Sequence, residues 1–272
     1  MSLDETIRRI ATRSVCTMPR PRALGRAVGR LLAVAGLSAI LGTAFAQGGP
    51  PMVTDDPGTP GDGHWEINLG AIATRTPGRW EIAAPDADIN YGLGDHVQLK
   101  LDVPWVTSRE DGQDWKSGAG EATIGMKWRF VDAEQAGFAL STYPQYGRSM
   151  LDSSIRRGIT GVGHQFFLPM EFAAEVGGIS IAAELGRNFV QGGPDQWVAG
   201  VVAGHGCGDG IECMAEVHSS QSHGNALTLL NVGTRWKLGD SCTLLASVGH
   251  EFGARTDEPR QLLAYLGMQF TK

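Results

Sequence analysis

Long runs in which apolar and polar residues alternate constrain this chain more than any other feature of its sequence. The clearest run is 86–105, DADINYGLGDHVQLKLDVPW, where two alternating stretches flank the turn YGLGD. The second stretch has one apolar and one polar face, formed by Val97, Leu99, Leu101, Val103 and Trp105 and by His96, Gln98, Lys100 and Asp102. A period of two around a tight turn predicts a hairpin. A fully apolar face opposite a charged face suits a strand between lipid and water.

The same alternation recurs and predicts twelve strands. Their expected ranges are 64–74, 80–93, 96–107, 121–130, 137–146, 165–174, 179–190, 196–205, 212–220, 227–238, 243–252 and 261–271. Compact turns alternate with connections that are on average longer and more polar, the longest being 147–163. Strands of soluble β-sandwiches are usually shorter and polar on their outer face. The pattern therefore predicts an all-β fold, an antiparallel transmembrane β-barrel of about twelve strands in the bacterial outer membrane, with both barrel termini periplasmic.

Tryptophans are placed as an interfacial aromatic belt would have them. Six of them fall near the ends of the expected strands: Trp65, Trp80, Trp105, Trp128, Trp197 and Trp236. Aromatic rings of this kind concentrate at both membrane–water interfaces.

Residues 1–46 are predicted to be an N-terminal extension followed by a secretory signal peptide. The apolar stretch 31–46 is shorter than the ~20 residues that a spanning helix needs, four arginines precede it, and Ala44-Phe45-Ala46 supplies small residues before a cleavage point. Met18 would start a leader of ordinary length, and an uncleaved anchor helix is the alternative. Residues 47–63, rich in Pro, Gly and Asp, are expected to form a lead-in or a strap across the barrel mouth that cannot pack a core. The barrel itself is expected over 64–272.

The charge of the exported chain excludes one class of partner. Seven Arg and two acids lie in 1–46, which leaves 16 basic and 27 acidic residues and a formal charge of −11. An acidic chain without a basic patch is a poor candidate for nucleic acid. The expected partners are outer-membrane lipid and lipopolysaccharide, the barrel-assembly machinery during insertion, and a small-molecule solute of unknown identity.

Placing the polar faces inward predicts a narrow, charged lumen. The residues expected to line it are Glu66, Asp86, Asp88, Lys100, Asp102, Glu121, Lys127, Arg129, Glu184, Glu216 and Arg235. One hypothesis is a channel or transport-like protein that passes small solutes, with cations favoured by the acidic excess. The alternative is a structural barrel whose interior is closed because its acids and bases pair with one another.

A membrane-embedded lipid hydrolase is a further hypothesis, resting on one expected outer loop. Its candidate residues are His218, Ser219, Ser220, Ser222, His223 and Asn225. Neighbours on a loop do not make a triad, and the chain has no GxSxG elbow. We therefore predict no catalytic, cofactor-binding or metal-binding residues and no enzyme activity. His218 and His223 are too few for a metal site.

The cysteines predict one covalent link. Cys207 and Cys213 bracket the turn CGDGIEC, and export to an oxidising compartment favours a disulfide between them. Free thiols are the alternative. A zinc site would need more ligands than the nearby His205.

Four stretches of the mature chain also resemble a known family. They are PMVTDDPGTPGDGHWEINLGA, DINYGLGDHVQLKLDVPW, GAGEATIGMKWRF and the following STYPQ. The chain resembles, in order and over nearly all of its mature length, the bacterial outer-membrane "transporter" family named after the meta-cleavage pathway of phenol degradation. The resemblance implies an outer-membrane barrel with a channel or transport-like role, possible passage of aromatic or other hydrophobic compounds, and no catalytic motif.

Overall fold

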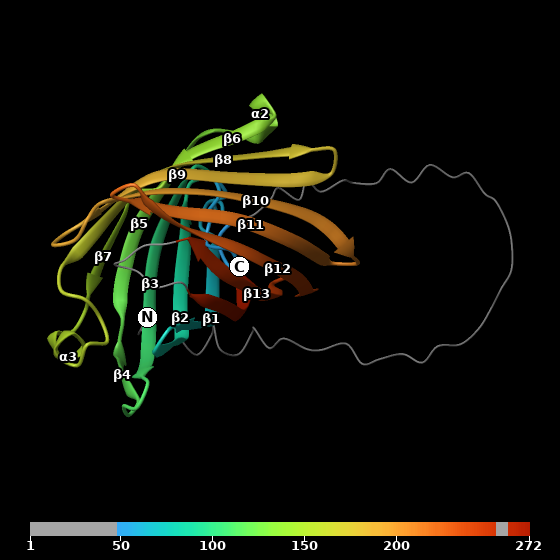
Figure 1. Cartoon of the computed structure of the whole chain (residues 1–272). Coiled ribbons are helices and arrows are strands. Elements are labelled where there is room, and N and C mark those ends of the chain that lie inside the picture. Colours follow the sequence, from blue (N-terminus) through green and yellow to red (C-terminus); the bar gives the residue numbers. More distant parts are fainter. Residues whose placement is uncertain (1–47, 254–260) are drawn as a thin grey trace, which may run out of the picture. The chain divides into compact units, whose positions relative to one another are not determined.

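The structure, a computed structural model, describes residues 48–253 and 261–272 of the 272-residue chain (Figure 1). The predicted extension and signal peptide, residues 1–46, lie outside the described residues, as do Gln47 and the loop residues 254–260. Among the described residues, no helix is long and apolar enough to cross a membrane.

The described chain is almost entirely β-strand. The strands are β1 (Trp65–Thr76), β2 (Arg79–Leu93), β3 (Val97–Glu110), β4 (Lys116–Ala119), β5 (Glu121–Val131), β6 (Phe138–Thr142), β7 (Gln145–Ser149), β8 (His164–Val176), β9 (Ile179–Val190), β10 (Gln196–Gly208), β11 (Ile211–Ser222), β12 (Asn225–Gly239), β13 (Cys242–Gly253) and β14 (Leu262–Thr271). Two short helices, α2 (Ala133–Ala136) and α3 (Asp152–Arg156), lie in connections.

These strands form a closed, antiparallel barrel of twelve wall strands, which confirms the predicted fold. Closure occurs between β1 and β14, in register from Glu66↔Thr271 to Arg75↔Leu262. The backbone N–H of Trp65 donates to the carbonyl of Lys272 at 2.8 Å, and the reverse bond is 2.9 Å long. The two barrel termini therefore lie side by side at one end. In Figure 1 this end carries α2, and we call it the turn end; α3 and β4 mark the opposite, loop end.

Two wall strands are interrupted where backbone donors are missing. β4 and β5 together make one wall strand, broken at Gly120 opposite Pro104, with a one-residue shift in their pairing with β3. β6 and β7 make another, broken at Tyr143 and Pro144, and the register on both neighbours is the same before and after the break. Proline has no N–H to give to a ladder, so each break is local and the wall remains continuous.

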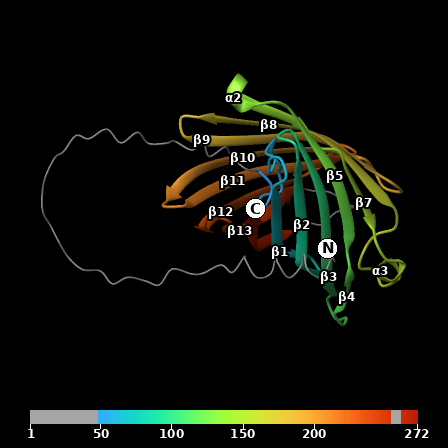
Figure 2. The ribbon, with the colours of Figure 1, turned by 180° about the vertical axis from the view of Figure 1, so that it is seen from behind.

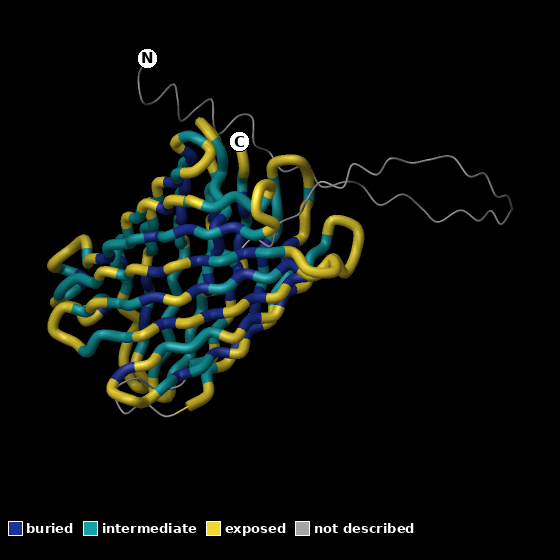
Figure 3. Tube along the Cα trace, turned by 90° about the horizontal axis from the view of Figure 1, so that it is seen from above, coloured by how far each residue is buried: buried dark blue, intermediate teal, exposed yellow. Residues whose placement is uncertain are grey.

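The barrel is apolar outside and polar inside. Outward-facing Ile124, Leu185 and Leu266 are 57%, 58% and 58% exposed, whereas inward-facing Lys127 and Glu171 are 2% and 1% exposed. Figure 3 shows the resulting alternation of buried and exposed positions along each strand. Since large apolar side chains do not cover a water-soluble surface in this way, the outer wall is suited to lipid.

Candidate functional site: the polar lumen and its N-terminal plug

Residues 48–58 lie inside the barrel, and we call this segment the plug. In Figures 1 and 2 the plug, drawn in blue, lies between the wall of β2, β3 and β5 and the wall of β10 to β13. Met52 is 5% exposed and packs with the buried Ala182, Val202 and Met214, and Thr54 is fully buried. The expectation that this Pro/Gly/Asp-rich stretch cannot pack a core is therefore wrong for 48–58, because Met52 packs against apolar residues of the wall while polar wall residues bind the backbone of the segment.

Glu216 on β11 binds the backbone of the plug. Its carboxylate accepts the N–H of Thr54 at 2.6 Å and that of Val53 at 3.0 and 3.2 Å. The side-chain amide of Asn231 donates to the same carboxylate at 2.9 Å. A buried carboxylate that collects several N–H donors is well satisfied, so Glu216 fixes the middle of the plug.

Arg235 on β12 binds the first residues of the plug through their carbonyl groups. Its guanidinium donates to the carbonyl oxygens of Gly48 at 2.7 Å, Gly49 at 3.2 Å and Pro50 at 2.8 Å. Ser247 on β13 donates to the carbonyl oxygen of Pro51 at 2.8 Å. One wall thus binds both donors and acceptors of the plug backbone, contacts that depend little on the plug's side chains.

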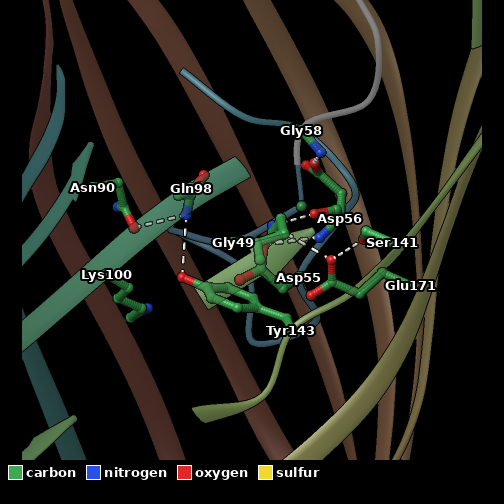
Figure 4. Close-up of polar contacts among 12 residues, drawn as sticks. Gly49, Asp55, Asp56, Gly58, Asn90, Gln98, Lys100, Ser141, Tyr143 and Glu171 are labelled. Atoms are coloured by element: carbon green, nitrogen blue, oxygen red, sulfur yellow. Dashed lines mark hydrogen bonds and ion pairs between the residues drawn. The ribbon is translucent and has the colours of Figure 1, made fainter. Parts of the chain in front are cut away.

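Lys127 on β5 holds the plug from the opposite wall. Its ammonium lies 3.0 Å from Oδ1 of Asp55 and 3.5 Å from Oε2 of Glu171, and it also donates to the carbonyl of Asp56. Ser141 donates to Glu171 at 2.5 Å (Figure 4). The ring of Tyr143 lies 4.6 Å from the Lys127 ammonium. A lysine this deeply buried is tolerated because it has two carboxylates and a ring face around it.

A second polar network lies beside the first, on β1 to β3. Lys100 lies 3.2 Å from Asp88, whose other oxygen accepts the Asn68 amide at 3.2 Å. Gln98 donates to Asn90 at 2.8 Å and to the hydroxyl of Tyr143 at 3.1 Å (Figure 4). Tyr143 therefore joins the two networks.

The pKa values of the two plug aspartates, Asp55 and Asp56, are shifted in opposite directions. Burial raises the pKa of Asp55, but the neighbouring Lys127 and Lys100 ammonium groups lower it by more, so its pKa lies below the usual value. For Asp56 burial outweighs the effect of Lys127, and its pKa lies above the usual value. Lys127 accordingly pairs with the side chain of Asp55 but with the backbone carbonyl of Asp56.

Glycines in the wall make room for the plug. A Cβ atom on Gly200 of β10 would lie 2.0 Å from Oγ1 of Thr54, and one on Gly233 of β12 would lie 2.4 Å from Cε of Met52. Both distances are shorter than any real contact. The wall and the plug are therefore matched in shape as well as in charge.

The lumen is hollow on the loop side of the plug. A cavity of about 440 Å³, which we call the vestibule, is lined by acidic and apolar groups and capped by the loop that follows α3. Its lining is Ile72, Thr74, Glu81, Ala83, Asp86, Asp102, Pro104, Val106, Glu121, Ile159, Thr160 and Gly161. A second cavity of about 310 Å³, lined in part by Val53, Asp55, Glu184 and His218, lies against the plug. On the other side of the plug only about 40 Å³ is free in the cavity beside Gly48–Pro50, Asp56 and Gly58.

The eleven residues expected to line the lumen lie on the inward strand faces but at different levels. Lys127, Glu216 and Arg235 bind the plug, and Glu184 lies beside it. Glu66, Asp88 and Lys100 line the small cavity beside the plug. Asp86, Asp102 and Glu121 line the vestibule. Arg129 lies at the turn-end rim, where it bonds Asp132 and the carbonyl of Asp95.

The loop-end serines considered for a hydrolase make structural hydrogen bonds. Ser219 donates to the carbonyl of Leu227 at 3.2 Å, and Ser222 donates to the carbonyl of Asp195 at 3.1 Å. His218 points into the lumen beside the plug, whereas His223 lies in the β11–β12 turn. Within the described ranges, no group of three or more His, Cys, Asp or Glu side chains is placed to hold a metal ion. Cys207 and Cys213 form a disulfide at the turn end of the β10–β11 hairpin.

Solved outer-membrane channels share this fold. The COG4313 outer membrane channel from Pseudomonas putida F1 matches with a TM-score of 0.55 and 11% identity over 77% of this chain and 96% of that one. The KdgM porin in complex with disordered oligogalacturonate has a TM-score of 0.53 and 10% identity over 75% of this chain and 98% of its own. The NanC porin has a TM-score of 0.51 and 6% identity, with the same coverage. No family model and no curated protein sequence matches the chain. At these identities the likeness establishes the fold alone.

Proposed function

We propose that this chain is an outer-membrane channel for small solutes whose passage is closed, in this structure, by its own N-terminal plug. The turn end and both barrel termini face the periplasm, as short turns do in bacterial barrels. The outer wall is apolar, the inner wall is polar, and the vestibule and the cavity against the plug together offer a path inward from the loop end.

One observation carries this proposal: a separate chain segment lies in the centre of the lumen, bound by side chains of the wall. A closed structural barrel would fill its bore with paired wall residues. Here Glu216 and Arg235 form hydrogen bonds with the backbone of residues 48–54, and Gly200 and Gly233 leave space for that segment. Because the plug is a segment separate from the wall strands, it can leave the lumen and open it while the wall stays intact.

The lining of the vestibule supports small solutes that combine an apolar body with a polar or positively charged group. Ile72, Pro104, Val106 and Ile159 offer apolar contact, while Asp86, Asp102 and Glu121 offer hydrogen-bond acceptors. This mixture suits aromatic compounds better than sugars. We also propose membership of the phenol meta-pathway "transporter" family. The four stretches that resemble this family supply one cluster of contacting residues, Asp55, Asp88, Lys100, Lys127 and Tyr143.

The closed structural barrel is the second candidate, because the charges at the level of the plug are largely paired. Lys127 with Asp55 and Lys100 with Asp88 are two such pairs. The same experiment separates the two candidates.

The test is conductance across a planar bilayer of the refolded protein and of a variant that lacks residues 48–58. We expect the deletion to convert a mostly closed protein into one with steady openings, and vesicles containing it to admit small phenols faster than sugars of similar mass. Arg129→Ala, a change on the inner wall away from the plug, is the matched control and should behave as the unaltered protein. If the deletion variant folds but conducts no ions, the channel proposal fails and the closed structural barrel is the better account.

A further inference from the structure

Among residues 48–253 and 261–272, the outer wall carries four arginines, and all of them lie near the loop end. Arg75, Arg109, Arg148 and Arg187 each stand within the last four residues of β1, β3, β7 and β9. Arg187 lies between the exposed Leu185 and Phe189 in the outward set of β9. Arg75 pairs with the exposed Leu262.

The other two arginines are outward by the same reasoning. Arg109 is four residues beyond the exposed Trp105 on β3. Arg148 is two residues beyond Tyr146, whose partner across the sheet is the exposed Ile124. All four guanidinium groups therefore belong to the wall that meets lipid.

Three of these arginines stack on tryptophans. The guanidinium carbon of Arg75 lies 5.2 Å from the ring centre of Trp80, that of Arg109 lies 4.9 Å from Trp115, and that of Arg187 lies 5.1 Å from Trp197. Stacking covers one face of a guanidinium but not its N–H edge, and that edge fits two phosphate oxygens at once.

The turn end of the outer wall is different. Its outward positions hold aromatic and aliphatic residues such as Trp65, Trp128 and Trp236, and no described strand has an outward-facing Lys or Arg there. At the loop end, two of the arginines pair with described acidic residues: Asp111 lies 3.3 Å from Arg75, and Asp195 lies 3.4 Å from Arg187. Arg109 and Arg148 join no ion pair within residues 48–253 and 261–272. The positive charge is thus confined to one membrane interface and is only partly neutralised.

A hollow adjoins one of the Arg–Trp pairs. It measures about 410 Å³ and is lined by Arg187, Asp195, Trp197, Gln221, Ser222, His223 and Gly224. Trp197 and Gln221 pair across β10 and β11 on the outward side, so the hollow opens on the outer wall near the loop end. It offers a guanidinium, an amide and a ring to one headgroup.

We propose that these loop-end arginines form a binding surface for the phosphate groups of lipopolysaccharide in the outer leaflet. This rests on the membrane orientation given under the proposed function, but not on the barrel conducting. Arg75 and Arg109 lie on either side of Trp80 in register across β1, β2 and β3, and make one patch. Arg187 with its hollow makes a second. A bisphosphorylated glycolipid suits this arrangement, since its acyl chains can lie on the apolar wall below each patch while its phosphates meet the guanidinium groups.

The test is native mass spectrometry of the full mature protein in detergent, titrated with lipid A, with dephosphorylated lipid A and with phosphatidylglycerol. We expect lipid A to bind best. The double change Arg75→Gln with Arg109→Gln should weaken lipid A binding at least about tenfold, and Arg187→Gln about fivefold. Arg156→Gln, in the exposed helix α3, removes the same charge away from the wall and should leave binding unchanged.

Equal binding of dephosphorylated lipid A to the unaltered protein would overturn the proposal, and this comparison needs no variant to fold. Equal binding of phosphatidylglycerol would overturn the choice of lipopolysaccharide. Unchanged lipid A binding by the arginine variants, with the heat-dependent gel mobility of a folded barrel, would also overturn it. Bilayer conductance should be the same in all these variants, so failure here is distinguishable from failure of the channel.

Discussion

The plug level and the vestibule are two parts of one lumen, and their charged side chains differ in what they contact. At the plug, Lys127, Glu216 and Arg235 all bind atoms of residues 48–56. In the vestibule, Asp86, Asp102 and Glu121 join no ion pair in the part of the chain that the structure describes, and they border a cavity of about 440 Å³. Charge at the first level holds a segment in place, whereas charge at the second is available to a solute.

A single strand contributes to both levels. Lys127 and Glu121 lie on the inward face of β5, six residues apart, which is about 20 Å along a strand. Because the lysine is sequestered by Asp55 and Glu171, it does not neutralise the carboxylate above it. The plug level and the vestibule therefore differ in whether their charged side chains have ion-pair partners, more than in which residues line them.

The largest expected effect comes from Lys127→Ala. Removing one member of a buried charge group leaves the carboxylates of Asp55 and Glu171 without their cation, at a cost of about 3–5 kcal/mol. We expect this cost to fall on the docked plug, because Asp55 can leave the site while the wall cannot. The open fraction in planar-bilayer recordings should then rise by about two to three and a half orders of magnitude.

Arg129→Ala is the matched change for this prediction. Arg129 lies two residues further along the same face of β5 and contacts the turn-end rim, not the plug. An equal rise in the open fraction for both variants would show that β5 had been disturbed generally, and the distinction between plug level and vestibule would lose its support.

A smaller effect is expected from Gly200→Ala. The added methyl group would lie 2.0 Å from Oγ1 of Thr54, and overpacking of this kind typically costs about 1–3 kcal/mol. The plug, which is held without strand pairing, should move before the wall does, and the open fraction should rise about tenfold. Gly206→Ala on the same strand meets no atom within 4 Å and should have no effect. Adding Thr54→Gly to Gly200→Ala should restore closure; if it does not, the clash between the added methyl group and Thr54 is not what displaces the plug.

The wall could be predicted from sequence because its signal is local. Each strand shows its period of two within about ten residues, and the predicted strand at 179–190 has the bounds of β9. The interruptions at Gly120 and at Tyr143 and Pro144 were missed, although Pro104 and Pro144 within alternating stretches were the available signal. Residues 147–163 were expected to be a polar loop, yet β7 continues to Ser149, and Ile159 is buried and lines the vestibule.

The plug could not be predicted because nothing near it in sequence binds it. Residues 48–58 have the composition of a solvated linker, and their partners are Lys127, Glu216 and Arg235, at least 71 positions away along the chain. The only hint of an occupant was the inward Glu216, whose cross-strand neighbours Val202 and Asn231 carry no positive charge. Satisfaction of buried polar groups is a property of the whole lumen, which a short stretch of sequence does not display.

The smallest expected effect concerns the vestibule and uses the variant without residues 48–58, so that current can be measured. Changing Asp86→Asn together with Asp102→Asn replaces two carboxyl groups by amides of nearly the same volume. The preference for cations over anions should fall about two- to threefold, because each charge acts across hydrated space. The reversal potential in a potassium chloride gradient measures this directly. Glu175→Gln removes a charge from the exposed turn end of β8 and should shift the potential less. A potential unmoved by the double change would mean that ions bypass these carboxylates, and the vestibule would then be no more available to solutes than the plug level.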